Sequence, residues 1–144
     1  MKKITIMLLA ALLSTTTISA CTGNNTPESK KETVAKQESP VEVIYFHGKQ
    51  RCKTCIAIEN ETKALMEGEL ANLVKSGKVK FRIVDISSDE GEVLATKFKV
   101  SFSSLLVVTK DGIEDLTHFA FSNARTNAEA FRKELKSKIM EAII

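Results

Sequence analysis

Two cysteines, Cys52 and Cys55, stand between an apolar run and a helix-like stretch, and their position constrains the fold more than any other feature of the sequence. Val41 to Phe46 is typical of a buried strand, and the stretch from Cys52 to Val74 has helical spacing of its apolar residues. Unpaired backbone N–H groups at a helix start stabilise a thiolate, so Cys52 is the expected nucleophile. Cys55 follows one turn later, close enough to form a disulfide with it.

Residues 1–20 have the pattern of a bacterial export signal. A basic start precedes an apolar stretch, residues 4–13, that is too short to remain as a membrane-spanning helix. The signal ends in Ile18-Ser19-Ala20-Cys21, which fits a lipobox with Cys21 as the lipidated residue. The alternative is an ordinary signal peptide cut near Ala20, which leaves Cys21 as an unpaired thiol. We expect a lipid anchor that holds the protein in the cell envelope, on the outer side of the cytoplasmic membrane or on the outer membrane.

The polar tract of residues 21–39, which begins at Cys21, is expected to be a flexible tether because it contains almost no apolar residues. Residues 40–144 remain for one domain with a single modest core. The formal charge of +3 falls to +1, with 19 basic against 18 acidic side chains, once Lys2 and Lys3 leave with the signal. This balance gives no support for a nucleic-acid partner. Export places the dithiol where disulfides persist, so an envelope electron donor or oxidant must set its redox state.

The rest of the domain alternates between strand and helix patterns. An Asp-Gly turn within residues 110–112 joins a third strand to an antiparallel fourth strand. The expected strands are residues 79–86, 104–109 and 113–121. A helix is expected over residues 90–98, with Val93, Leu94 and Phe98 facing inward. The final helix is expected to open with the capping-box pattern Thr126-Asn127-Ala128-Glu129 and to include Met140 in its apolar stripe. This β-α-β-α-β-β-α order predicts an α/β fold with a four-stranded mixed sheet and helices on both faces.

The residues around Cys52 favour its ionised form. Lys49, Arg51 and Lys53 place three positive charges near the helix start, and we expect them to lower the pKa of Cys52. In the expected reaction Cys52 attacks a substrate disulfide, and the more buried Cys55 resolves the mixed disulfide. A purely structural disulfide is the alternative. Such a disulfide would add little stability, because closing so short a loop removes little entropy from the unfolded chain.

A metal site is the competing interpretation of the same residues. His47 and His118, together with Cys52 and Cys55, supply enough imidazole and thiolate ligands for zinc or copper. Their spacing is not that of a zinc finger, so we expect His47 to be a solvated loop residue and His118 a surface residue of an edge strand. No Gly-rich phosphate loop predicts a nicotinamide or flavin site, and the expected redox group is the disulfide itself.

From Val41 onward the chain resembles the thioredoxin superfamily, which implies a thioredoxin-like fold. The segment from Val100 to Val108 is similar to the family's segment that faces the active-site cysteines, which makes Ser103 and Ser104 neighbours of the site. The family has a cis-proline where this chain has Ser104, and we expect a trans bond here because a cis bond without proline is costly. It also has tryptophan at the position of Arg51 and Gly-Pro in place of Lys53-Thr54, which favours a specialised partner over ordinary thioredoxin substrates.

A narrower resemblance extends over nearly all of residues 40–144. It is carried by residues 45–55, 84–86, 103–106, 115–117 and 119–125. It is to the family of small thioredoxin-like lipoproteins that form subunits of nitrophenyl-compound nitroreductases, linked to bacterial resistance to aromatic arsenicals. This resemblance implies a redox subunit that passes electrons from an envelope donor toward nitro groups, with Cys52 and Cys55 as its active-site residues. A metal or metalloid binder, for copper, zinc or arsenic, and a non-catalytic adaptor remain alternatives.

Overall fold

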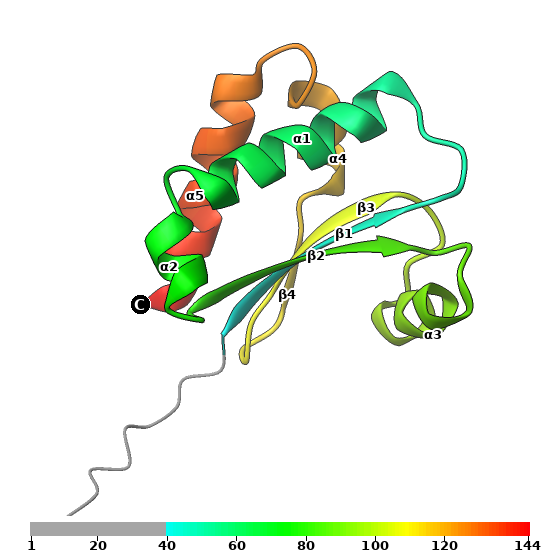
Figure 1. The fold of residues 1–144 in the computed structure, drawn as a ribbon, viewed down its shortest axis with the longest axis horizontal. Coiled ribbons are helices and arrows are strands. Elements are labelled where there is room, and N and C mark those ends of the chain that lie inside the picture. The colour runs from blue at the N-terminus through cyan, green and yellow to red at the C-terminus, as the bar shows by residue number, and fades with distance from the viewer. Residues whose placement is uncertain (1–39) are drawn as a thin grey trace, which may run out of the picture. The chain divides into compact units, whose positions relative to one another are not determined.

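The computed structural model describes residues 40–144 (Figure 1). The expected signal peptide, the lipidation site at Cys21 and the tether of residues 21–39 lie outside the described residues. In the part that is described, none of the helices combines the length and the apolar content needed to cross a bilayer. The elements are β1 (Val41–His47), α1 (Lys53–Glu67), α2 (Ala71–Lys75), β2 (Val79–Asp85), α3 (Asp89–Phe98), β3 (Ser104–Val108), β4 (Ile113–Asp115), α4 (Thr117–Asn123) and α5 (Ala128–Ile143).

The strands form one four-stranded mixed sheet in the order β2-β1-β3-β4. β1 runs parallel to β2 and antiparallel to β3, and the predicted hairpin joins β3 to β4. In Figure 1, α1 and α5 lie over one face of the sheet and α3 lies against the other. The predicted thioredoxin-like α/β fold is therefore confirmed, and most predicted element ends agree with the observed ends within one residue.

Strand β1 contributes buried side chains to both faces of the sheet, which explains its nearly unbroken apolar sequence. Val43 and Tyr45 belong to the core beneath α1, α4 and α5. Ile44 and Phe46 belong to the second core, beneath α3. All four are fully buried, so the end of β1 is held on both sides. The loop that carries the cysteines begins at this fixed end.

The predicted helix over residues 52–74 is two helices in the structure. α1 ends at Glu67, and Gly68 has non-helical dihedral angles of φ −97° and ψ −98°. The Gly68 N–H donates to the Ala64 carbonyl at 2.9 Å and completes the last turn of α1. The interruption that a glycine inside a helical pattern predicts is therefore present.

The predicted fourth strand over residues 113–121 is wrong beyond its first three residues. β4 ends at Asp115, whose carboxylate accepts a hydrogen bond from the Thr117 N–H at 2.8 Å, and α4 begins there. α4 then directs Ala120 into the core. His118 is consequently an exposed residue of helix α4, and its predicted place on an edge strand is corrected.

Details of two other helices also differ from the prediction. Val93 was expected to face inward, but its side chain is 71% exposed on α3. The residue that caps α5 is Asn127, whose Oδ1 accepts the Ala130 N–H at 3.2 Å, so the predicted capping box that begins at Thr126 does not form. Met140 is exposed and does not extend the buried stripe of α5.

We expect Thr62→Val to raise the free energy of unfolding by about 1 kcal/mol, because it removes a buried hydroxyl that has no hydrogen-bond partner among residues 40–144. Thr62 is fully buried in α1, and valine keeps its branched shape. Urea unfolding followed by circular dichroism measures the change. The exposed Thr96 in α3 provides the control, and Thr96→Val should change stability by less than about 0.5 kcal/mol. A loss of stability in Thr62→Val would contradict the absence of a partner.

Candidate redox site

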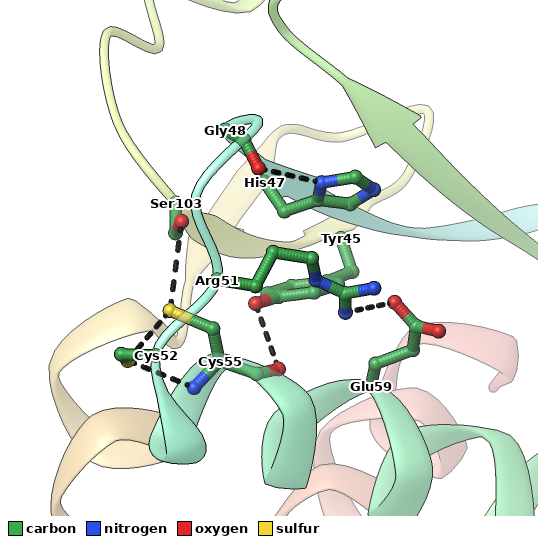
Figure 2. Close-up of polar contacts among 8 residues, drawn as sticks. All are labelled: Tyr45, His47, Gly48, Arg51, Cys52, Cys55, Glu59 and Ser103. Atoms are coloured by element: carbon green, nitrogen blue, oxygen red, sulfur yellow. Dashed lines mark hydrogen bonds and ion pairs between the residues drawn. The ribbon is translucent and has the colours of Figure 1, made fainter.

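The two cysteines lie side by side at the N-terminus of α1 (Figure 2). Their sulfur atoms are 2.8 Å apart and not bonded to each other, so the structure shows the dithiol. Cys52 is the N-cap residue of α1, and its Sγ accepts the Cys55 N–H at 3.2 Å. Cys52 is exposed, whereas Cys55 is 6% exposed and lies in the first turn. One sulfur is thus open to solvent and the other is close behind it.

Hydrogen bonds at the helix start lower the pKa of Cys52. The largest contribution is a hydrogen bond from the Cys55 thiol, followed by the backbone N–H of Cys55. The direction and the contribution of the helix start are those expected from the sequence, but the three cations expected to contribute as well are not among the main causes. Arg51 pairs with Glu59, and Lys53 is an exposed first residue of α1. The helix terminus and the second thiol, not nearby cations, therefore stabilise the thiolate.

Tyr45 joins the sheet to the helix beneath the dithiol. Its hydroxyl donates to the Cys55 carbonyl at 2.9 Å, and its ring is fully buried on β1. Burial raises the pKa of Tyr45 well above its ordinary value, so the phenol remains a donor at neutral pH. This bond fixes the first turn of α1 against β1 and thereby fixes the position of the Cys55 sulfur.

Arg51 holds the loop that enters the helix. Its guanidinium pairs with Glu59, which lies about two turns along α1, and Figure 2 shows the Arg51 side chain extending beside the Tyr45 ring. The Lys49 N–H donates to the Ser87 hydroxyl at 3.0 Å and ties the same loop to the end of β2. The residues on both sides of the loop are therefore anchored, which limits how far Cys52 can move.

The segment before β3 faces the cysteines, as the resemblance implied. Ser103 Oγ lies 3.9 Å from Cys55 Sγ. Ser104 is buried, pairs with Phe46 in the sheet and donates its hydroxyl to the Phe102 carbonyl at 3.1 Å. Residues 40–144 contain no cis peptide bond, so Ser104 follows a trans bond as expected. Of the two predicted neighbours, Ser103 is the one that contacts a sulfur.

The alternative metal ligands do not come together. Within residues 40–144, no group of three or more His, Cys, Asp and Glu side chains is close enough to hold a metal ion. The His47 ring nitrogen Nδ1 lies 3.0 Å from the Gly48 carbonyl, and His118 lies on α4. The alternative four-residue set of His47, Cys52, Cys55 and His118 is therefore not assembled.

Two supporting residues were missed in the sequence, Tyr45 and Glu59. A signal for Tyr45 was present, because a tyrosine within a buried strand normally needs a hydrogen-bond partner for its hydroxyl. Glu59 had no distinguishing signal, since a glutamate within a helix is usually solvated. Its pairing with Arg51 depends on the course of the loop before α1.

We expect the rate of Cys52 alkylation by iodoacetamide to reach half its maximum below the pH of a free cysteine, about 8.5, because the thiolate is the reactive form and its pKa is lowered. Peptide mapping by mass spectrometry measures the rate. Cys55→Ala should raise this midpoint by removing the largest stabilising hydrogen bond. Lys49→Ala is the matched control and should leave the midpoint nearly unchanged. A midpoint at or above that of free cysteine would contradict the assigned cause.

Comparisons with known proteins find similarity only among solved structures. No family model matches the chain, and no curated protein matches it. The chain is similar to Fasciola hepatica thioredoxin, with a TM-score of 0.48 and 20% identity over 73% of this chain and 83% of that one. It is also similar to a malarial protein, with a TM-score of 0.42 and 25% identity over 65% of this chain and 97% of that one. The element order, the strand order and the cysteine pair at the start of α1 are those of a thioredoxin-like fold with a dithiol site.

Proposed function

We propose that this protein is an exported, membrane-tethered thiol–disulfide oxidoreductase that relays electron pairs through Cys52 and Cys55. The observation that carries the proposal is the sulfur pair itself. Cys52 is exposed at the helix N-cap, and the buried Cys55 sulfur lies 2.8 Å behind it. A nucleophilic thiol that is open to a substrate, with a second thiol within bonding reach, is the arrangement required for disulfide exchange.

The proposed reaction balances within the dithiol and its substrate. The Cys52 thiolate attacks one sulfur of a substrate disulfide, which forms a mixed disulfide and releases the other sulfur as a thiolate. Cys55 then loses its proton and attacks Cys52, which releases the second substrate thiol and forms the Cys52–Cys55 disulfide. The substrate is reduced by one electron pair and the protein is oxidised by the same pair. An envelope donor must return that pair before the next cycle.

The acceptor that we propose is a nitroreductase partner that acts on nitroaromatic compounds. The segments shared with the nitroreductase-subunit family support this, since they include residues 45–55 around the dithiol and residues 119–125 on and just after α4. Full reduction of a nitro group to an amine needs several electron pairs, whereas the dithiol delivers one in each cycle. The dithiol therefore serves as a relay, and a flavin or another redox group on the partner carries out the nitro chemistry.

The proposed location is the cell envelope, with Cys21 lipidated and residues 21–39 as the tether. The support is the sequence of residues 1–21, with its basic start, its short apolar stretch and its lipobox-like end. A lipid anchor would keep the dithiol near a membrane-bound donor and partner. Labelling of cells with radioactive palmitate tests this, and incorporation that Cys21→Ser does not reduce would contradict it.

A redox titration tests the oxidoreductase function directly. The purified chain, in a Cys21→Ser background, is equilibrated in buffers of increasing reduction potential, and the oxidised fraction is measured by thiol alkylation. We expect one reversible two-electron transition between about −120 and −270 mV, the range of disulfide oxidoreductases. A dithiol that stays oxidised below about −300 mV would be a structural bond and would contradict the proposal. Cys55→Ser, which cannot form the internal disulfide, is the control.

The nitroreductase step has its own test. Cells that depend on this chain receive 4-nitrobenzoate, and the amine product is measured over time. Cells with Cys52→Ser should form the amine more slowly than cells with the unchanged chain. An unchanged rate would contradict the proposed nitroaromatic acceptor. It would not contradict the oxidoreductase function, which the redox titration tests separately.

A further inference from the structure

The outer edge of β2 carries backbone groups that no described strand pairs. Among the strands of residues 40–144, β2 lies at the end of the sheet and bonds only to β1. The Val41 N–H donates to the Lys78 carbonyl and the Ile86 N–H to the His47 carbonyl, both at 2.9 Å. Because bonded residues alternate in a parallel ladder, Phe81 and Ile83 direct their N–H and C=O groups away from β1. They provide donors and acceptors for one more strand.

An apolar groove of about 390 Å³ lies beside this edge. Its apolar wall comes from Met66 of α1, Val74 of α2, and Phe81 and Ile83 of β2. Val74 is 37% exposed and Ile83 is 42% exposed, although both belong to regular elements. Figure 1 shows α2 next to the beginning of β2. Alternate side chains of an added strand would enter this groove.

The charges around the edge are mainly positive. Lys63 and Lys75 line the groove, and Glu67, the acid beside them, pairs with Lys63 at 3.8 Å. Lys80 and Arg82 alternate with Phe81 and Ile83, so they lie on the other face of β2. Arg82 pairs with Glu42, whereas Lys75 and Lys80 have no ion-pair partner among residues 40–144. An acidic ligand would compensate these charges.

A second copy of this chain would fit the edge less well than an acidic segment would. An antiparallel pairing centred on Phe81 would place Lys80 of one copy opposite Arg82 of the other. Like charges in directly opposed positions destabilise a strand pair. Lysines on an edge strand also discourage pairing between identical sheets. The charge pattern therefore favours a different, acidic partner.

We propose that β2 binds an extended segment of a partner protein in which apolar residues alternate with Asp or Glu, as a fifth strand of the sheet. The apolar side chains of the segment occupy the groove, and its carboxylates approach Lys80 and Arg82 on the other face. The part of the groove on α1 begins at Lys63, whereas Cys52 caps the start of this helix, about 17 Å away along its axis. The site is thus separate from the dithiol and does not depend on the proposed redox function.

Fluorescence anisotropy of a labelled peptide tests this proposal with the purified full chain. The probe is Glu-Val-Asp-Ile-Glu-Val-Asp, and its charge-inverted counterpart is Lys-Val-Lys-Ile-Lys-Val-Lys. We expect the acidic peptide to bind about tenfold or more tightly than the basic one. Lys80→Glu should reduce that preference several-fold. Equal binding of the two peptides, or no binding of the acidic peptide at about 1 mM, would overturn the proposal.

Proline substitutions distinguish strand addition from simple charge attraction. Ile83→Pro removes an outward N–H without breaking the bonds to β1, and it should weaken acidic-peptide binding about tenfold. Ile113→Pro is the matched control on the opposite edge strand, β4, and it should leave binding unchanged. Circular dichroism checks that both variants are folded. If Ile83→Pro is unfolded, Ile83→Ala replaces it, since it removes apolar contact with the groove without adding a charge and should also weaken binding. Unchanged binding in the folded β2 variant would overturn the proposal.

Light scattering and the peptide-binding assay together test for other occupants of the edge. A dimer seen by light scattering that Ile83→Pro dissociates would assign the edge to a second copy and overturn the proposal. A peptide of residues 22–39 that binds more tightly than the acidic peptide would assign the edge to the chain's own segment, with the same consequence.

Discussion

Cys52→Ser is expected to lower the rate of insulin disulfide reduction, with dithiothreitol as the reductant, by about a hundredfold or more. Serine has no thiolate at neutral pH and cannot form the mixed disulfide. Cys55→Ser should fail differently. Its Cys52 still attacks the substrate, but no second thiol lies 2.8 Å away to release it, so a mixed disulfide accumulates. The two variants should therefore have similarly low turnover but different products.

Non-reducing electrophoresis and intact-mass measurement distinguish these products. The control is Thr54→Ser, which changes a residue between the cysteines and leaves both sulfurs in place. It should retain turnover within a few-fold of the unchanged chain. Equal turnover in Cys52→Ser and the unchanged chain would exclude Cys52 as the nucleophile. A mixed disulfide on Cys55, accumulating in Cys52→Ser, would reverse the two roles.

The position of the dithiol could be predicted from local sequence because its causes are local. An apolar run buried on both faces leads directly into a helix, and the helix start fixes the distance between residues three apart. The sequence placed Cys52 at the start of α1, where it is the N-cap residue. It also placed Cys55 one turn later, where the fold buries it.

The contribution of neighbouring cations to the thiolate's stability could not be predicted in the same way. The sequence shows Arg51 next to Cys52, but it does not show that the guanidinium points toward Glu59. That orientation depends on the loop before α1 and on its contact with β2 through Ser87. The sequence therefore identified the direction of the pKa shift and the helix start as one of its causes, whereas the weight of the cations and of the second thiol depends on the fold.

Helix α4 was missed because two patterns overlap in the same residues. Phe119 and Phe121 alternate with small or polar residues, which favours a strand. Leu116, Ala120 and Ala124 are spaced four apart, which is a helical pattern, and these three are the buried ones. The aromatic residues gave the stronger local signal for a strand. In the fold, the Asp115 carboxylate accepts the Thr117 N–H where α4 begins, and Ala120 and Ala124 pack in the core.

Gly91→Ala is expected to lower the free energy of unfolding by about 3 kcal/mol, with a fall in Tm of roughly 10–25 °C. A Cβ atom at Gly91 would overlap the Asp85 carbonyl oxygen and would lie 2.7 Å from the carbonyl carbon and 2.8 Å from Ser88 Oγ. Asp85 is the last residue of β2, and its carbonyl also accepts hydrogen bonds from the Ser88 N–H and hydroxyl. These atoms cannot move aside without shifting the start of α3.

The sign of this effect separates close packing from helix propensity. Propensity alone predicts that Ala in place of Gly stabilises α3 by about 1 kcal/mol. The overlap with Asp85 must outweigh that gain, because relief moves α3 away from the sheet and opens the core formed by Phe46, Val84 and Ala95. Urea unfolding measures the difference, with the exposed neighbour Glu92→Ala as a control expected to change stability by less than about 0.5 kcal/mol.

A stabilising Gly91→Ala would mean that α3 does not pack this closely on the end of β2. The loop before Cys52 would then be held less firmly, because the Ser87 hydroxyl that accepts the Lys49 N–H lies between Asp85 and Gly91 in the chain. A destabilised Gly91→Ala should instead show faster hydrogen exchange at the Lys49 amide, since the shift of α3 displaces Ser87. Stability and loop protection should therefore change together in this variant and should both be unchanged in Glu92→Ala.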